Sequence, residues 1–316
     1  MGLLITASLF SEAITNSKPL VGSINGRLVF PAYITYNKPK LGFSGGGVVD
    51  YKEIALDFQW ALWPLFSWDP FENDLNQMPL MAPPSSQHFM GTDTSGRDVF
   101  ARLLYGTRIS LIFGFGTCFV TFFIGTLVGL FQGYIGGKWD LFGQRFLEIF
   151  STIPEFYLLL FLITLFSPNL FLLIPLTSAF AWVGICQYMR GEALRNKNNL
   201  FTEASKSMGA STPHILFFHI LPNSLVPLVT LAPFSIVASI TTLAQLDFLG
   251  FGVPPPTASW GELLEQAHQN FQNAWWLTLF PSGLLFITTL SLNFIGQDVR
   301  LYISKDLTDS KKFESP

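Results

Sequence analysis

Few side chains of this 316-residue chain have the type and spacing that catalysis or metal binding needs. Glu155 is the one acid beside a long apolar stretch, where an ionisable group is a functional candidate unless it simply reaches water. Gln132 and Gln187 stand alone in apolar runs, so no nucleophile is paired with a base. Cys118 and Cys186 lie in similar runs, away from any cluster of metal ligands. We therefore predict no catalytic residue, no cofactor and no metal site.

A different pattern occupies "FTEASKSMGASTPHILFFHILPN", residues 201–223, whose first half is charged and whose second half is apolar. In a helix, Leu200, Ala204 and Met208 share one face at a spacing of four residues. Gly209 suits the left-handed conformation that commonly ends a helix. A groove in a partner protein accepts a helix face of this kind, with anchors four residues apart and an alanine that permits close approach.

Signals for two helices flank this glycine. Asn199 can cap the first helix, and Glu203 lies in its first turn, where the helix dipole favours an anion. Thr212 followed by Pro213 is typical of a second helix start, a cap and then a proline at the first helical position. The second helix is apolar nearly all round, so we expect it to lie against a membrane before Pro222 opens the next segment.

The composition predicts that lipid surrounds most of the chain. Hydrophobic residues make up 49% and charged residues 12%, about half the charged fraction of a typical soluble domain. The net charge of −3 provides no excess of positive charge of the kind that binds nucleic acid. A bilayer core needs about 20 apolar residues as helix. We predict an all-α membrane protein with five full spans near 110–134, 149–167, 170–188, 223–245 and 275–296.

The N-terminal part is predicted to differ from the rest. The run "MGLLITASLF" is apolar but reaches Glu12 before it is long enough to cross a bilayer, so it is either an interfacial segment or the end of a first span whose start lies upstream. We interpret residues 1–14 as a partial first transmembrane segment. Residues 15–90 contain glycine runs, prolines and the aromatic cluster "FQWALWPLFSW" at 58–68. They predict a folded or half-folded insertion outside the membrane, with its aromatic residues in a small local core or at the membrane surface.

The segment 91–108 is charged and directly precedes the first full span. Asp93 or Thr94 can cap a helix in which Val99 and Leu103 share a face. We therefore expect an amphipathic helix that lies along the membrane.

A second helix-packing signal lies within the first span, where Gly125, Gly129 and Gly133 recur at a spacing of four. Such a stripe allows either close packing of two helices or a slim helix that lines a pore, and packing is the commoner use.

Charged residues in the loops predict the orientation. The loop at 190–222 is rich in lysine and arginine, whereas the loop at 247–274 contains acids and no lysine or arginine. Because short basic loops stay in the cytoplasm, we place 190–222, 138–148 and the tail at 301–316 there. Residues 15–108 and 247–274 then lie outside.

Three ordered motifs resemble one family. "EASKSMG" followed by "HILP" is similar to the EAA loop of permease subunits of ABC importers, with Ser205 where the pattern has its second alanine. His219, in place of the usual isoleucine, is similar to the peptide-importer branch. The other motifs are "GTDTSGRDVFARLLYGTRISL" at 91–111 and "LDFLGFGVPPPTASWGELL" at 246–264, which resemble signatures of that branch. The resemblance covers residues 91–300.

The resemblance implies a type I ABC importer transmembrane domain at 91–300 in the cell inner membrane. It also implies a second permease subunit, cytoplasmic ATPase subunits and an extracytoplasmic peptide-binding protein as partners, besides membrane lipid. The chain has no Gly-x4-Gly-Lys-Ser/Thr loop, so it should not hydrolyse ATP itself. The predicted ATPase-coupling residues are Leu200, Glu203, Ala204, Ser205, Met208, Gly209, His219, Leu221 and Pro222. The predicted outer-mouth motif comprises Gly250, Gly252, Pro255, Trp260 and Gly261.

Several of these residues have an expected role. Glu203 would supply a polar contact, Ala204 and Ser205 the close approach, and Gly209 the hinge. The glycines and prolines at 250–256 would form a tight turn at the outer mouth, although they are equally compatible with an ordinary loop that has no functional role.

A narrower resemblance covers the insertion, where "NSKPL" and "NGRLVFP" are similar to the extended first loop of the Yej-type C-component permeases of microcin C and oligopeptide importers. The alternative function is a secondary transporter or channel that works alone. That class needs ion-coupling acids inside its spans, and Glu155 is nearly the only one here.

Overall fold

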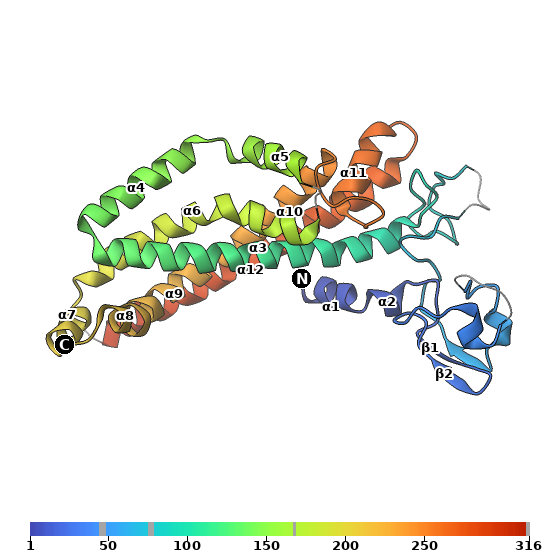
Figure 1. The fold of residues 1–316 in the computed structure, drawn as a ribbon, viewed down its shortest axis with the longest axis horizontal. Helices are drawn as coiled ribbons and strands as arrows, with labels where there is room; N and C mark the ends of the chain where they lie inside the picture. Colours follow the sequence, from blue (N-terminus) through green and yellow to red (C-terminus); the bar gives the residue numbers. More distant parts are fainter. Residues whose placement is uncertain (44–48, 75–78, 167–168, 314–316) are drawn as a thin grey trace. The chain divides into compact units, whose positions relative to one another are not determined.

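The computed structural model of the protein describes residues 1–43, 49–74, 79–166 and 169–313 (Figure 1). The chain divides into two compact units, one of Met1–Leu111 with Asp247–Thr288 and one of Ile112–Leu246 with Thr289–Pro316. Long helices contain residues of both units: α3 (Val99–Ile135), α10 (Ala232–Phe248) and α12 (Trp275–Phe313).

The longest apolar stretch forms α3, a continuous helix of 37 residues. Its start is capped by Asp98, because the side-chain Oδ1 accepts a hydrogen bond from the backbone N–H of Ala101 at 2.8 Å. The cap is therefore not Asp93 or Thr94. The amphipathic helix expected within 91–108 is the N-terminal part of the first apolar helix and not a separate element.

In the second unit, the glycine stripe of α3 packs against α6 (Leu170–Lys197). A Cβ atom added to Gly129 would lie 2.3 Å from the carbonyl oxygen of Cys186, and one added to Gly133 would lie 2.5 Å from that of Arg190. Only glycine lets the two backbones approach so closely. The packing interpretation of the stripe is confirmed.

Proline divides the span predicted at 149–167. α4 (Gly137–Thr152) and α5 (Glu155–Leu165) are bent by 76° at a break that contains Pro154. Proline lacks a backbone N–H, and its ring clashes with the preceding turn. The region of the span predicted at 149–167 is therefore a bent pair of helices, and an apolar window does not register such a bend.

The span predicted at 223–245 is divided as well. α9 (Leu221–Val229) ends shortly before α10, which has Pro233 in its first turn. α9 continues directly from a short π-helix, so the apolar helical run in this region begins at Thr212.

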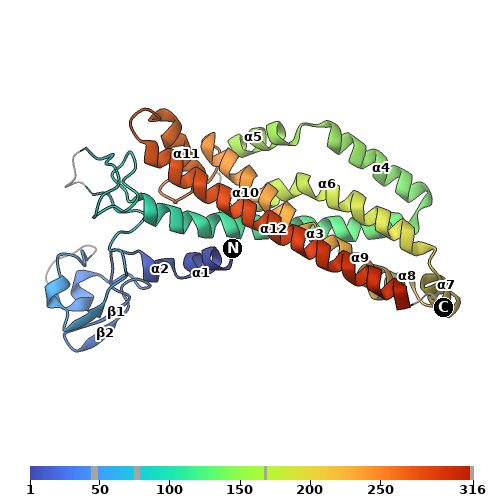
Figure 2. The ribbon, with the colours of Figure 1, turned by 180° about the vertical axis from the view of Figure 1, so that it is seen from behind.

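Among the described residues, four helices are long and apolar enough to cross a membrane, or five if α4 and α5 form one bent span. Figure 2 shows α12 as one long helix from behind, and it continues through Phe313. The predicted tail at 301–316 therefore begins as a helix. The candidate spans are Val99–Ile135, Leu170–Lys197, Thr212–Val229 and Trp275–Ile303, with the bent pair as a further one.

The first unit contains a small antiparallel sheet in the order β2-β1-β3. Asn25 and Gly26 connect the first two strands with φ values of 51° and 72°, which are the left-handed values that a tight hairpin needs. The strands are β1 (Val21–Ile24), β2 (Arg27–Val29) and β3 (Trp60–Leu62).

This sheet covers a local hydrophobic core whose members are at most 5% exposed. Phe58 and Trp63 of the aromatic cluster pack against it, whereas Trp60 is half exposed. The core residues are Ile24, Val29, Leu41, Val49 and Tyr51. The short 3-10 helices η1 (Lys38–Leu41) and η2 (Ala55–Asp57) complete the region.

The N-terminal residues form two short helices, α1 (Gly2–Leu9) and α2 (Ser11–Ile14). Glu12 in α2 is held by Arg108, with N–O distances of 2.6 and 2.7 Å. The guanidinium of Arg108 also donates to the carbonyl oxygen of Ser8 at 3.0 Å. The end of this N-terminal segment is thus fixed to the start of α3.

Candidate functional site

The segment 200–222 forms a helical hairpin, which we call the coupling hairpin. Its first helix is α7 (Leu200–Ser207), and Gly209 follows with φ of +83°. An added Cβ at Gly209 would meet no heavy atom within 4 Å, so the backbone conformation and not a lack of space requires glycine. The prediction of a left-handed residue at this position is confirmed.

One face of α7 is exposed and apolar. Leu200 is 84% exposed and Met208 is 81% exposed, and Ala204 between them is exposed as well. Glu203 is also exposed beside this stripe. We call Leu200, Ala204 and Met208 the exposed stripe.

The opposite face of α7 is fixed by polar contacts. Ser205 is 4% exposed, and its Oγ lies 2.7 Å from Nε2 of His219. Thr202 is also buried and donates its hydroxyl to the carbonyl oxygen of Asn196 at 2.8 Å. We expected Ser205 to allow close approach of a partner together with Ala204. The structure instead buries Ser205, which connects the two arms of the hairpin through His219. The small side chain at 205 is needed for an internal contact.

The helix starts differ slightly from the prediction. Asn199 is the N-terminal flanking residue of α7, but its side chain donates to Oδ1 of Asn196 at 2.8 Å and makes no capping bond. The second arm begins with α8 (Thr212–Ile215), whose flanking residue is Ser211. The predicted start at Thr212 and Pro213 was thus one residue late for the cap.

The second arm anchors the hairpin to the helices of its own unit. It continues as a π-helix, η3 (Leu216–Ile220), and then as α9. Ile215, Leu216 and Ile220 are at most 1% exposed and belong to a core cluster with residues of α3 and α6. Leu221 packs against the same cluster, and Pro222 is exposed in the first turn of α9.

A buried polar contact adds to this anchor. Ser224 is fully buried, donates its hydroxyl to the carbonyl oxygen of Ile220 at 2.9 Å and accepts from Nδ2 of Asn196 at 3.3 Å. The end of α6, the hairpin and α9 are therefore joined at one place.

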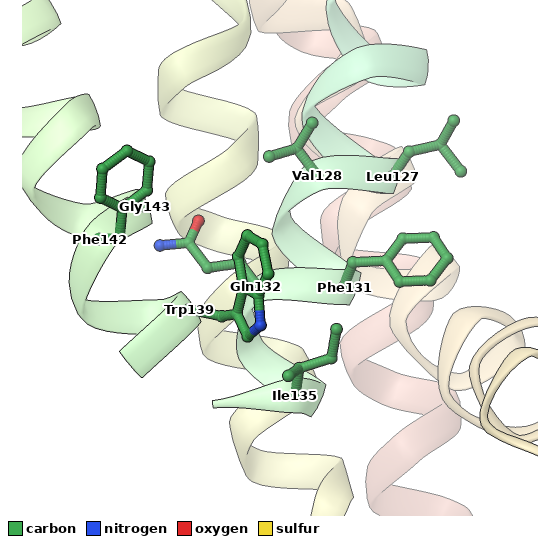
Figure 3. A pocket seen from close by; sticks show the side chains of 8 residues that line it. All are labelled: Leu127, Val128, Phe131, Gln132, Ile135, Trp139, Phe142 and Gly143. Carbon is green, nitrogen blue, oxygen red and sulfur yellow. The ribbon is translucent and has the colours of Figure 1, made fainter. Parts of the chain in front are cut away.

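A largely apolar groove of about 350 Å³ lies between the C-terminal half of α3 and the start of α4. Figure 3 shows the side chains that line it. Gln132 points across it toward α4, where a Cβ added to Gly143 would lie 2.7 Å from Nε2 of the glutamine. Nearby, Arg190 of α6 binds Asp140 of α4 with an N–O distance of 2.7 Å. These polar contacts fix the beginning of α4 against its neighbours.

In the first unit, the motifs at 91–111 and 246–264 form one polar cluster. Arg97 lies 2.7 Å from Asp93 and 3.0 Å from Glu262. Arg102, which is fully buried, also pairs with Glu262 and donates to the carbonyl oxygen of Pro70 at 3.0 Å. Sequence reasoning missed these charges as site residues. Their position inside two motifs that lie far apart in the chain was the available signal.

Trp260 at the start of α11 (Trp260–Gln269) holds the two motifs together. It is 1% exposed and donates its indole N–H to the carbonyl oxygen of Leu103 at 3.1 Å. A Cβ added to Gly106 would lie 2.9 Å from its ring. Gly261 beside it is buried, so both predicted residues serve packing within this unit.

The loop after α10 is a tight turn around Asp247, whose Oδ1 accepts the backbone N–H of Val253 at 2.7 Å. Gly250 has φ of +77°, and a Cβ at Gly252 would lie 1.7 Å from that same carboxylate oxygen. Burial raises the pKa of Asp247 to about 6, although the hydrogen bond from Val253 opposes this shift. Pro255 is exposed at the tip of the loop.

Comparison with known proteins places this architecture. Residues 125–306 match the family described as "Binding-protein-dependent transport system inner membrane component". The chain is 39% identical to the inner membrane ABC transporter permease protein YejE of Escherichia coli, over 94% of this chain and 89% of that protein. It is 38% identical to the oligopeptide transport system permease protein OppC of Haemophilus influenzae, over 72% of this chain and 74% of that one.

A likeness in fold extends to a solved structure, an inward-facing form of the MetNI methionine ABC transporter. The TM-score is 0.50 at 23% identity, over 63% of this chain and 97% of that one. The fold is therefore that of a type I ABC importer permease. Together with the family match and the close relatives, this shows that the chain belongs to the family of inner membrane components of binding-protein-dependent transport systems.

Proposed function

We propose that this permease forms half of the pathway of an ATP-driven importer for peptides or peptide-like compounds. The names of its relatives support the substrate class, since they include oligopeptide and peptide permeases. A second permease subunit supplies the other half, two cytoplasmic ATPase subunits supply energy, and an extracytoplasmic peptide-binding protein delivers the substrate. ATP is hydrolysed by the ATPases and not by this chain.

The single observation that carries the coupling role is the two-faced nature of the hairpin. Its exposed stripe has no covering in this chain, with Leu200 and Met208 each more than 80% exposed. Its other arm is buried among side chains of α3 and α6. An exposed apolar stripe on a rigidly anchored helix suits a groove in a partner, with Ala204 allowing close approach and Glu203 adding a polar contact.

The proposed mechanism uses the hairpin as a lever. When the ATPases close on ATP, the groove that holds the exposed stripe moves, and the buried arm passes the movement to α3 and α6. ATP binding shifts the populations of the inward-open and outward-open states of the permease if the ATP-bound ATPase holds the hairpin differently in the two states. Ser205 and His219 keep the two arms of the hairpin moving as one body.

The coupling role is tested by Ala204→Phe, which adds bulk on the exposed stripe. We expect association with the ATPase in a pull-down to fall at least about tenfold, the effect of roughly 1.4 kcal/mol. Lys206→Phe is the matched control, because Lys206 is also exposed in α7 but lies off the stripe. Equal association of the two variants would count against the lever.

The orientation is tested by Ser211→Cys, since Ser211 is exposed in the hairpin. An impermeant thiol reagent should label this cysteine only after the cells are opened, whereas Gln269→Cys in α11 should react on intact cells. The native Cys118 and Cys186 are buried and give a low background. Labelling of position 211 on intact cells would place the hairpin outside and remove the proposal.

The first-unit cluster is the proposed outer mouth. The buried Arg102–Glu262 pair and the turn around Asp247 hold the exposed loop tip at Pro255 in place, and we place this tip where the peptide-binding protein docks.

Uptake should require ATP and continue after the proton gradient is collapsed, which a secondary transporter would not do.

A further inference from the structure

A cavity with polar groups in its wall lies within the second unit and has a volume of about 810 Å³. Its wall is contributed by α3, the break between α4 and α5, α6 and α10. This volume is within the range of about 300–1,000 Å³ that small-molecule sites occupy. It is large enough for a short peptide segment.

Glu155 supplies the charge of this cavity, since it is the one acidic or basic side chain in the described part of its wall. It is the first residue of α5, directly after the bend at Pro154. Its carboxylate makes no ion pair or hydrogen bond with the residues that the structure describes, and it is exposed to the cavity. An ionisable group in a membrane helix that faces a cavity is a functional candidate, and a carboxylate without a partner suits a cation.

Aromatic rings line the same cavity as this carboxylate. Phe150 and Phe156 line the cavity on either side of the bend, and Phe180 of α6 lies opposite, with its ring centroid 5.9 Å from that of Phe150. Ring faces attract cations, most strongly where water is partly excluded. The combination of one carboxylate and several rings suits an organic ammonium group better than a strongly hydrated metal ion.

Amide side chains provide a second set of contacts. Gln187 of α6 and Gln245 of α10 both line the cavity, are exposed, and make no hydrogen bond within the described residues. An amide offers both donors and an acceptor, as a peptide bond does, so such contacts do not depend on the peptide's side chains. Thr121 of α3 also lines the wall, is 2% exposed and has a hydroxyl with no partner in the described structure.

We propose that this cavity is a transit subsite for the cationic end of a peptide, in which Glu155 binds the terminal ammonium group and Gln187 and Gln245 pair with peptide bonds. The inference rests on the proposed function, because it requires a peptide to pass along this chain. The subsite binds weakly, since a transported molecule must also leave it.

The test uses the complete importer, with both permeases, the ATPases and the binding protein, in lipid nanodiscs. The probe is a tripeptide of alanine, benzoyl-phenylalanine and alanine, which forms a covalent bond under ultraviolet light, and cross-linked residues are mapped by mass spectrometry. We expect cross-links to α5 and to the α10 residues that line the cavity. Glu155→Gln should lower their yield about tenfold, the usual effect of losing one charge-assisted hydrogen bond, and Glu155→Asp should restore part of it.

Two controls separate charge recognition from a general defect. The same tripeptide with an acetylated N-terminus should cross-link weakly and equally in the wild-type protein and Glu155→Gln. Glu148→Gln, which alters an exposed acid of α4 outside the cavity wall, should leave the yield unchanged. The proposed subsite is overturned if no cross-links form in the cavity, or if Glu155→Gln leaves the cross-linking yield unchanged.

Uptake measured in proteoliposomes of the same complex distinguishes the two failures. If wild-type complexes import the unmodified tripeptide with ATP but Glu155→Gln does not change cross-linking, the subsite is wrong and the proposed function stands. If wild-type complexes show no ATP-driven peptide uptake, the proposed function itself fails.

Discussion

Replacing Gly129 by alanine tests the packing of α3 against α6. The new Cβ would lie 2.3 Å from the carbonyl oxygen of Cys186 and 2.9 Å from Cβ of Met189. Ordinary contact begins near 3.4 Å, so the helices must separate by about 1.1 Å, the difference between these distances. Because the nearest atom belongs to a backbone, no side-chain rotation relieves the clash, and we expect a loss of about 1–3 kcal/mol.

The matched control is Gly191→Ala in α6, where an added Cβ meets nothing within 4 Å. Alanine stabilises a helix interior by about 0.5–1 kcal/mol over glycine, so the two identical changes should have opposite signs. Thermal unfolding of each variant in nanodiscs, followed by tryptophan fluorescence, gives the comparison. A Gly129→Ala protein at least as stable as the wild type would show that the two helices are not in this close contact.

Three further predictions concern the first unit. Arg102→Met removes the buried guanidinium that pairs with Glu262 and leaves this partly buried acid with Arg97 alone, so it should destabilise the unit by about 1.5–3 kcal/mol. The matched control in the second unit, the exposed Arg145→Met, should change stability by less than about 1 kcal/mol. Hydrogen exchange of residues 247–274 measures the first change, and that of α4 measures the second. Burial raises the pKa of Asp247 to about 6 from 3.8, so its folded form favours the proton. The stability that this gives is complete below about pH 3.8 and is lost as the pH rises through about 6, so the stability of the wild type relative to Asp247→Asn should fall across this window, and a constant difference would contradict it. Burial alone would lower the pKa of His88, but hydrogen bonds of its ring to the carboxylates of Asp98 and Asp74 outweigh burial and raise the pKa above its usual value. The wild type should therefore lose stability relative to His88→Gln as the pH rises above about 6.5 in urea titrations at several pH values, and an advantage that grows with pH would contradict this.

Local patterns in the sequence predicted the parts of the site that depend on neighbouring residues. The left-handed Gly209 and the shared face of Leu200, Ala204 and Met208 follow from the periodicity of one helix. The close approach at the glycine stripe follows from the same kind of spacing. These features need no knowledge of the rest of the chain.

Contacts between distant residues were not predictable in the same way. Ser205 faces inward because His219, on the other arm of the hairpin, meets it there. Arg102 and Glu262 are separated by 160 positions, so neither identifies the other from the sequence. The apolar run at 149–167 concealed the bend, since average hydropathy contains no information on direction.

The exposed stripe also has a consequence for how the protein is produced. Leu200 and Met208 present apolar side chains that nothing in the described part of this chain covers. If the ATPase covers them, as we propose, they stay exposed until assembly, and quality-control proteases and chaperones recognise such surfaces. A cell that makes this chain alone should therefore degrade it quickly, and its lifetime should lengthen when the ATPase is synthesised alongside it. Assembly would then regulate abundance without any dedicated control element.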